Sequence, residues 1–237
     1  MNFEFPSGPD SIRGALYLPE QTDPRPGVVV IPDVRGLHDH YHDVARRLAR
    51  DGFVALALDL YSREGPPDLP DMETVFRFMR ELPDSRVLQD IGQAIDALSK
   101  HPSVGQSRVG ITGFCMGGMY TILAACTCKG LSAAVSWYGM LRVQEIDESS
   151  PEHPLEALPR LSCPLLGLFG KEDPIVPLGD VEELQREGAS QSHEVEVVVY
   201  PGAGHAFAND TRPDAYRADA AEDAWSRALA FLHRYLD

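Results

Sequence analysis

Long apolar runs are absent from this sequence: no segment of its 237 residues approaches the ~18 apolar residues of a membrane-spanning helix. The stretch from Met1 to Asp10 lacks a basic region followed by an apolar one, so we expect no signal peptide. Basic residues are also few, since 21 Lys and Arg face 36 Asp and Glu and the formal net charge is −15. Such a surface repels nucleic acid phosphates and anionic lipids, and we expect neither as a partner.

Cysteine is rare as well, with four residues in the chain. The spacing of Cys115, Cys126, Cys128 and Cys163 matches no zinc or haem pattern. Cys126 and Cys128 lie two apart in a predicted helix, which is poor geometry for a disulfide. These features favour a reducing, cytoplasmic setting.

The composition is that of a globular protein, with 43% hydrophobic and 24% charged residues. No linker or internal repeat interrupts the chain, and we expect a single domain over residues 1–237. Short alternating runs at 2–5 and 12–18 predict an antiparallel hairpin. Strands then alternate with helices, which predicts an α/β fold: a mostly parallel sheet with the N-terminal hairpin at its start and helices on both faces. The later strands are expected at 28–31, 53–58, 108–112, 131–137, 165–169 and 195–200, and the acidic segment 141–160 as a surface loop.

One loop has the pattern of a nucleophile elbow. Gly113-Phe114-Cys115-Met116-Gly117-Gly118 lies between a predicted buried strand and a helix, with cysteine where serine is commoner. The N-terminus of the helix favours a thiolate. A phosphate-binding loop would need a Lys and a Ser or Thr that are missing here. A small buried hydrophobic residue is the other interpretation of Cys115.

Two further strand-end loops carry an acid and a histidine. Asp173 follows the strand at 165–169, and His205 follows the strand at 195–200. Taken alone, Asp173 is more commonly explained by an Asx-type turn before Pro174, and a single loop histidine is usually a surface residue. Nucleophile, acid, then histidine is, however, the order of the α/β-hydrolases. The loop after Ile31 and the residue after the nucleophile supply the oxyanion hole in that fold, which here assigns the backbone amides of Val34 and Met116.

These loops resemble the dienelactone hydrolase family over almost the whole chain. The cysteine elbow, the acid loop, the Gly204-His205-Ala206-Phe207 run and the Ser136-Trp137-Tyr138-Gly139 run carry the resemblance. It implies an α/β-hydrolase fold and a small-molecule lactone or ester as substrate. It also implies an acyl-enzyme formed by Cys115, with His205 and Asp173, and no metal or organic cofactor.

The resemblance also implies roles for residues around the nucleophile. Asp33 stands where the family often has a Glu that contacts the resting thiol. Asn209 stands where studied members have an Arg that binds the substrate carboxylate; Arg77 and Arg80 are candidates for the family's second Arg. We expect Arg35, Trp137, Tyr138 and Phe207 to line the substrate pocket.

Three other interpretations remain open. A general carboxylesterase or thioesterase would use the same residues, and a non-catalytic binding protein would keep the fold alone. A metal protein is the third, because His38, His40 and His42 lie among Asp39 and Asp43. Such residues at a helix start are more often solvated or capping. No motif specifies the acyl group, the leaving group or the oligomeric state.

Overall fold

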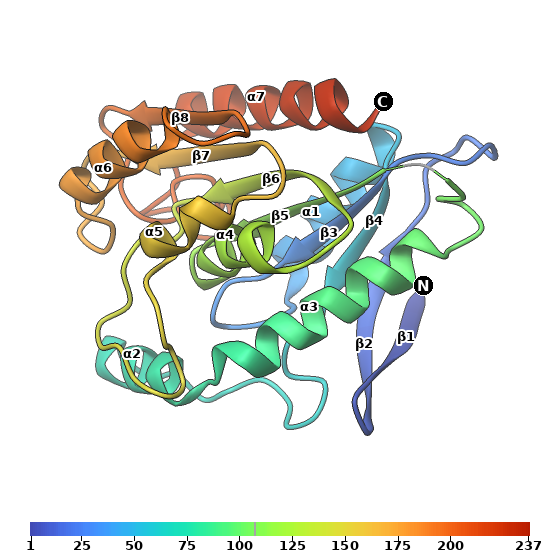
Figure 1. The fold of residues 1–237 in the computed structure, drawn as a ribbon, viewed down its shortest axis with the longest axis horizontal. Helices are drawn as coiled ribbons and strands as arrows, with labels where there is room; N and C mark the ends of the chain where they lie inside the picture. Colours follow the sequence, from blue (N-terminus) through green and yellow to red (C-terminus); the bar gives the residue numbers. More distant parts are fainter. Residues whose placement is uncertain (107) are drawn as a thin grey trace.

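The structure of the protein, a computed structural model, describes residues 1–106 and 108–237. Within these ranges the strands form one eight-stranded sheet in the order β1-β2-β4-β3-β5-β6-β7-β8 (Figure 1). β1 pairs antiparallel with β2 and β2 with β4, and all other neighbours are parallel. The predicted mostly parallel sheet with an N-terminal hairpin is therefore confirmed. The strands are β1 (Asn2–Ser7), β2 (Asp10–Tyr17), β3 (Gly27–Ile31), β4 (Val54–Leu58), β5 (Val109–Phe114), β6 (Leu131–Trp137), β7 (Leu165–Gly170) and β8 (Val195–Tyr200).

Helices cover both faces of the sheet, as predicted. α1 and α7 pack on one face, and α3, α4 and α6 pack on the other (Figure 1). No helix in the described ranges has both the length and the apolar character needed to cross a membrane. The helices are α1 (Asp39–Arg50), α2 (Met72–Glu81), α3 (Asp84–Ser99), α4 (Met116–Thr127), α5 (Pro154–Ala157), α6 (Leu178–Gly188) and α7 (Ala218–Leu236).

The central strand β3 shows why the sheet is covered twice. Its five residues are all buried, and alternate side chains point to opposite faces. Val29 and Ile31 join the core beneath α3 and α4, whereas Val28 and Val30 join the core beneath α1 and α7. A continuous apolar run is thus required, because neither face of this strand meets water.

The prediction of a surface loop over residues 141–160 is wrong at its C-terminal end. Pro154–Ala157 form α5, and Leu158–Arg160 form a short 3-10 helix, η1, that packs on α4. The amide of His153 donates to the Glu156 carboxylate at 3.3 Å and caps this turn. Leu155, Leu158 and Leu161 are buried at a spacing of three, which the acidic residues before them obscured in the sequence.

The parallel strands bring their carboxyl ends to one edge of the sheet. The arrows of β6 and β7 point to that edge, at the left of Figure 1. The loops that follow β3, β5, β7 and β8 meet there, and they carry Val34, Cys115, Asp173 and His205. Helix α2, which follows a Pro-containing loop, lies over the same edge (Figure 1).

Candidate active site

Cys115 sits on a strained turn between β5 and α4. Its backbone has φ 56° and ψ −118°, a region that residues with a side chain rarely adopt. Its amide donates to the carbonyl of Trp137 at 3.0 Å, which holds the turn against β6. A Cβ at Gly113 would lie 2.2 Å from the carbonyl oxygen of Gly117, and one at Gly117 would lie 2.3 Å from the carbonyl oxygen of Ile31. Both glycines are therefore required for the turn to close.

Asp173 makes two kinds of bond with its two oxygens. Oδ1 accepts hydrogen bonds from the amides of Ile175 at 2.8 Å and Val176 at 3.1 Å, which is the turn-forming role. Oδ2 lies 2.8 Å from Nδ1 of His205. The two interpretations of Asp173 are thus compatible, because the turn fixes the carboxylate that contacts the imidazole.

His205 links the acid loop to the elbow. Its side chain is 9% exposed, and its ring stacks edge-on against Tyr138 at 5.2 Å between centroids. Within the described residues Nε2 has no hydrogen-bond partner. His205 and Cys115 line the same cleft. With Nδ1 held by Asp173, Nε2 is the nitrogen free to exchange a proton in that cleft.

The environment of His205 favours its charged form. Burial alone would lower the pKa of His205, but the neighbouring charge of Cys115 and the hydrogen bond to Asp173 oppose it and raise the pKa to about 10. The imidazolium is therefore the stable form of His205 at neutral pH when a negative charge faces it from the cysteine. This is the charge arrangement expected of a thiolate–imidazolium pair.

The two backbone amides predicted for the oxyanion hole come from the loop after β3 and from the first residue of α4. Met116 is the first residue of α4, so its amide has no acceptor within the helix. Val34 lines the cleft together with Cys115. The hydroxyl of Tyr61 donates to the carbonyl of Val34 at 2.9 Å and fixes this loop. Sequence reasoning did not identify Tyr61, because the contact spans 27 residues.

Asp33 is buried beneath the same loop. Its Oδ1 accepts a hydrogen bond from the Arg35 amide at 2.8 Å and lies 3.7 Å from Nε2 of His38. Burial would raise the pKa of Asp33, but the nearby His38 imidazole and the hydrogen bond from the Arg35 amide outweigh it and hold the pKa below its ordinary value. In the described part of the chain no hydrogen bond joins Asp33 to Cys115, so the loop-capping role is the one seen.

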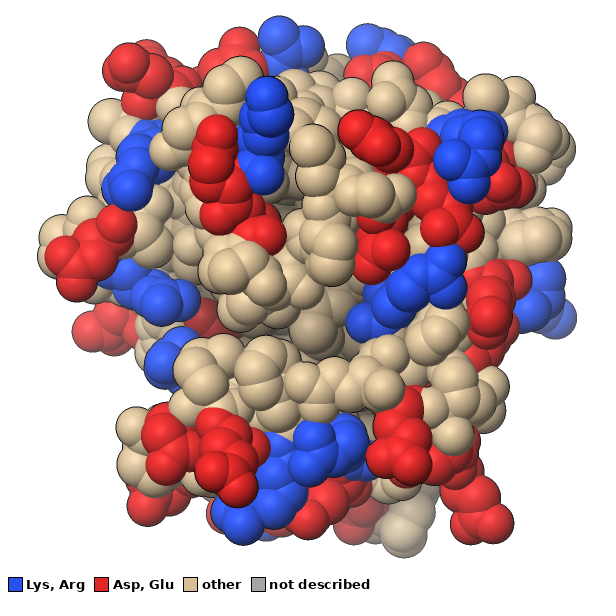
Figure 2. Space-filling view, turned by 90° about the vertical axis from the view of Figure 1, so that its left-hand side faces the viewer, with Lys and Arg blue, Asp and Glu red and all other residues tan. Residues whose placement is uncertain are grey.

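The cleft over Cys115 has a volume of about 520 Å³ and both apolar and cationic walls. Figure 2 shows this face of the molecule, where an uncharged hollow is surrounded by acidic and basic side chains. Of the arginines named from the sequence, Arg35 lines the cleft, whereas Arg77 and Arg80 do not. The apolar wall comes from α2 and the loops after β6 and β7: Met72, Val75, Phe76, Met79, Met140 and Ile175.

Two arginines that sequence reasoning missed also line the cleft. Arg212 and Arg217 lie in the long segment between His205 and α7. The guanidinium of Arg217 donates to the backbone carbonyls of Gly202, Asp214 and Tyr216. Neither Arg35 nor Arg212 has a salt-bridge partner among residues 1–106 and 108–237. The position of Arg212 and Arg217 in the chain, shortly after the His205 loop, is the sequence signal that could have identified them as cleft residues.

The other predicted pocket residues lie deeper. Trp137 packs on Phe114 on the α7 side of the sheet, and its Nε1 donates to Thr112 at 3.0 Å. Phe207 is fully buried on that side as well. Tyr138 lies between His205 and Phe207, with φ 41° and a buried hydroxyl. None of the three lines the cleft over Cys115 among the described residues.

The histidine cluster at the start of α1 is dispersed over separate partners. His38 faces Asp33, while Nδ1 of His40 bonds to Asp210 at 3.1 Å and Nδ1 of His42 to the Tyr17 hydroxyl at 3.0 Å. No three His, Cys, Asp or Glu side chains of the described ranges gather into a metal-binding group.

Comparison with known proteins places this geometry in a family. The sequence model of the dienelactone hydrolase family matches residues 12–236. A protein of Escherichia coli (strain K12) named "Putative carboxymethylenebutenolidase" is 39% identical over 233 residues, covering 97% of this chain and 85% of that protein. A Bradyrhizobium sp. protein named "Probable 2-oxo-3-(5-oxofuran-2-ylidene)propanoate lactonase" is 37% identical over 221 residues, covering 93% and 88%.

A solved structure supports the same family assignment as the family model and the sequence relatives. The putative dienelactone hydrolase of Klebsiella pneumoniae subsp. pneumoniae MGH 78578 superposes with a TM-score of 0.92 at 36% identity, covering 99% of this chain and 98% of that chain. Similarity of this extent covers the sheet, the elbow and the loops that carry Asp173 and His205. The chain therefore belongs to the dienelactone hydrolase family and has the α/β-hydrolase fold.

Proposed function

We propose that the protein hydrolyses a lactone or carboxylic ester through an acyl-enzyme on Cys115, with His205 and Asp173 completing the triad. The observation that carries the proposal is the orientation of His205. Its Nδ1 is held by Asp173 at 2.8 Å, Nε2 is buried without a partner among the described residues, and His205 lines the cleft that holds Cys115. A histidine held in this way transfers a proton between nucleophile, leaving group and water.

The reaction begins with attack of the Cys115 thiolate on the carbonyl carbon. The carbonyl oxygen becomes an oxyanion that accepts hydrogen bonds from the amides of Val34 and Met116, each typically worth ~3 kcal/mol. The carbon–oxygen bond of the ester then breaks, and the imidazolium of His205 gives its proton to the leaving oxygen. The product of this half-reaction is a thioester on Cys115 and an alcohol or enol.

Water completes the cycle. Neutral His205 takes a proton from water, the hydroxide adds to the thioester carbonyl, and the thiolate leaves. The acid product gives its own proton to solvent and departs as a carboxylate, and the thiolate–imidazolium pair is restored. For a lactone both halves belong to one molecule, which stays tethered through its acyl group until water releases it.

The cationic wall favours a substrate that carries an anionic group. Arg35 and Arg212 present guanidinium groups to the cleft in a chain whose net charge is −15. Asn209, at the position of the family's arginine, is instead buried and uses Oδ1 to accept bonds from Thr211. Arg212 lies three residues further on and lines the cleft, so we propose that it takes over the carboxylate contact.

The test begins with p-nitrophenyl acetate and iodoacetamide. Turnover that disappears in step with alkylation of Cys115, mapped by mass spectrometry, supports the proposal. Turnover that survives full alkylation of Cys115 contradicts the cysteine mechanism. Absence of turnover, with Cys115 unlabelled in the folded protein, favours a binding protein instead.

A second set of substrates tests the lactone assignment. A lactone with a free carboxylate and its methyl ester differ in one charge, and we expect the protein to prefer the acid. Arg212→Gln should lower kcat/KM for the acid by about tenfold or more, because a charged hydrogen bond is typically worth about 1.5–3 kcal/mol, and leave the methyl ester less affected. Equal kcat/KM values for acid and methyl ester would favour a general carboxylesterase.

A further inference from the structure

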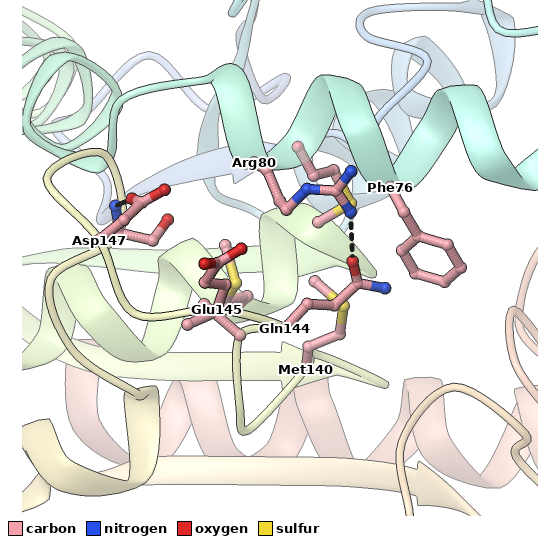
Figure 3. Close-up of a pocket in the computed structure, with 10 residues that line it drawn as sticks. Phe76, Arg80, Met140, Gln144, Glu145 and Asp147 are labelled. Carbon is pink, nitrogen blue, oxygen red and sulfur yellow. Dashed lines mark hydrogen bonds between the residues drawn. The ribbon is translucent and has the colours of Figure 1, made fainter.

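A small apolar chamber opens beside the cleft over Cys115. It shares Phe76, Met79 and Met140 with the cleft and extends away from the nucleophile to Met119 and Val143. Its volume is about 30 Å³, which corresponds to roughly two water-sized spheres. Figure 3 shows Phe76 on one side of this chamber and Met140 on the other.

The walls of the chamber differ in how deeply they are buried. Met119 of α4 and Met140 after β6 belong to the main core and are 3% and 8% exposed. Phe76 and Met79 come from α2 and are half-buried. Methionine side chains adapt readily to the shape of a ligand, so this chamber can widen without a backbone change.

A polar rim separates the chamber from solvent. The Arg80 guanidinium of α2 donates to the side chain of Gln144 at 2.7 Å and bridges the two walls (Figure 3). Glu145 and Asp147 stand beside this bridge and are exposed. Two carboxylates at the rim disfavour an anionic group here, in contrast to the arginines on the other side of the cleft.

The position of His205 identifies which part of a substrate meets the chamber. A leaving oxygen must lie within reach of Nε2 of His205 to receive its proton. The leaving group therefore extends towards the histidine segment, where Gly204, Arg212 and Arg217 line the cleft. The described lining of the chamber includes no residue from that segment or from the Asp173 loop. The acyl part of the substrate extends in the opposite direction, towards the chamber.

We propose that this chamber is the acyl-side specificity pocket and that it accepts an uncharged hydrocarbon group of about two or three carbon atoms. The inference rests on the proposed function, since it concerns the ester bound at Cys115. It names the substrate class more narrowly: an acyl group with a short apolar extension, or a lactone with such a substituent next to its carbonyl. The cationic wall then receives the anionic end of the same substrate.

The experiment compares p-nitrophenyl esters of acetate, propanoate, butanoate, hexanoate and octanoate. Each methylene that enters the chamber should raise kcat/KM by up to about fourfold, and the gain should stop once the chamber is full. We expect a maximum near butanoate. A flat series, or one that falls from acetate onward, would overturn the inference.

Variants of Val143 show whether the chamber causes the preference. Val143 lines the chamber but not the cleft over Cys115. The hydrogen bond that its backbone N–H donates to Nδ1 of His153 does not involve the Val143 side chain, so a substitution can keep it. Val143→Phe should fill the chamber and lower the ratio of kcat/KM for butanoate to that for acetate by about tenfold. Val143→Ala should move the optimum to a longer chain. A ratio that stays constant in both variants contradicts the proposal, and Val143→Ala keeps the test decisive if the Phe variant folds poorly.

Leu18→Phe is the matched control, because Leu18 is 39% exposed and lies outside the cleft and the chamber. It should leave the ratio unchanged. The two proposals fail in different ways. If the wild-type protein turns over no ester at Cys115, the proposed function fails. If acetate is hydrolysed at Cys115 but the chain-length ratio ignores Val143, only the chamber assignment fails.

Discussion

The two walls of the cleft, the nucleophile elbow and helix α2, are packed to very different degrees. At the elbow the first eleven residues of α4, Met116 to Cys126, are buried, and backbone atoms of β3 and α4 almost touch. Among the residues of α2, all of which the structure describes, only Val75 is buried. Because so little of α2 is buried, few contacts anchor this helix to the sheet. A Pro-containing loop precedes it, and Leu82-Pro83 follows it.

The difference separates the chemistry from the selection of substrate. The proposed triad residues and Val34 lie on loops that follow strands of the sheet, and Met116 begins α4, so displacement of an atom there is costly. The side chains of α2 only shape the apolar wall, and a loosely packed helix can adjust to different acyl groups. We therefore expect substitutions at the elbow to affect kcat and stability strongly, and substitutions in α2 to affect mainly KM.

The largest effect is expected from removal of the thiol. Cys115→Ala should lower kcat/KM for p-nitrophenyl acetate by at least ~10³-fold, because the nucleophile of a triad cannot be replaced by its partners. Cys115→Ser tests the thiolate itself and should retain little activity. Cys128→Ala is the control, since Cys128 is equally half-buried at the opposite end of α4. Wild-type rates in Cys115→Ala would contradict the account.

Asp173→Asn should lower activity strongly, as is expected of Cys115→Ala, while the stability of the protein changes little. The amide keeps an oxygen for the Ile175 and Val176 amides but no longer stabilises the imidazolium of His205, so kcat should fall by ~10²–10⁴-fold. Steady-state kinetics together with thermal unfolding separate the two roles. A variant that unfolds early yet keeps its kcat would show that Asp173 is only a turn residue.

Two glycine substitutions compare the elbow with the surface. In Gly117→Ala the new Cβ would lie 2.3 Å from the carbonyl oxygen of Ile31, so we expect destabilisation of ~1–3 kcal/mol and loss of activity. In Gly179→Ala of α6 nothing lies within 4 Å, and the change should be neutral or stabilising by up to ~1 kcal/mol. Urea denaturation measures both. Equal stabilities would mean that the elbow is less tightly packed than described.

The titration of His205 predicts how stability depends on pH. Its pKa is raised from 6.5 to about 10 on folding, so the folded state binds the proton more tightly than the unfolded one. This contribution is complete below pH 6.5 and is lost as the pH rises through about 10. The difference in free energy of unfolding between the wild type and His205→Gln should therefore shrink between these pH values. A difference that stays constant would contradict a charged His205.

The smallest effect is expected at the start of α2. The carboxylate of Asp71 accepts a hydrogen bond from the Thr74 amide at 2.8 Å, and Asp71→Ala should destabilise the first turn of α2 by removing this cap. Hydrogen exchange in α2 should then accelerate, while exchange in α4 stays unchanged. Asp68→Ala in the same loop is the control. Acceleration in both helices would show that α2 is not an independent element.

The sequence predicted what depends on local pattern. Continuous apolar runs identified β3 and its neighbours, and the order of Cys115, Asp173 and His205 predicted loops that the structure brings to one edge. Trp137 was predicted in the pocket but faces α7, because a run of four residues does not say which face of a strand each side chain takes.

Other features depend on contacts between distant segments. The bond between Arg80 and Gln144 spans 64 residues, and no periodicity reports it. Arg212 lies in an irregular segment between β8 and α7, so its place in the cleft that holds Cys115 was not encoded in a motif. The buried Leu155 and Leu158 were hidden by the acidic residues around them.

Rapid acid quenching of the reaction with p-nitrophenyl butanoate, followed by peptide mapping, traps the proposed acyl-enzyme itself. We expect a butanoyl group on Cys115, which accumulates within the first turnover and is absent from Cys115→Ala. We also expect a larger trapped fraction in Asp173→Asn if hydrolysis of the thioester becomes the slow step. Steady turnover with no acyl group on Cys115 at any time, or an acyl group on another residue, would contradict the proposed cysteine mechanism.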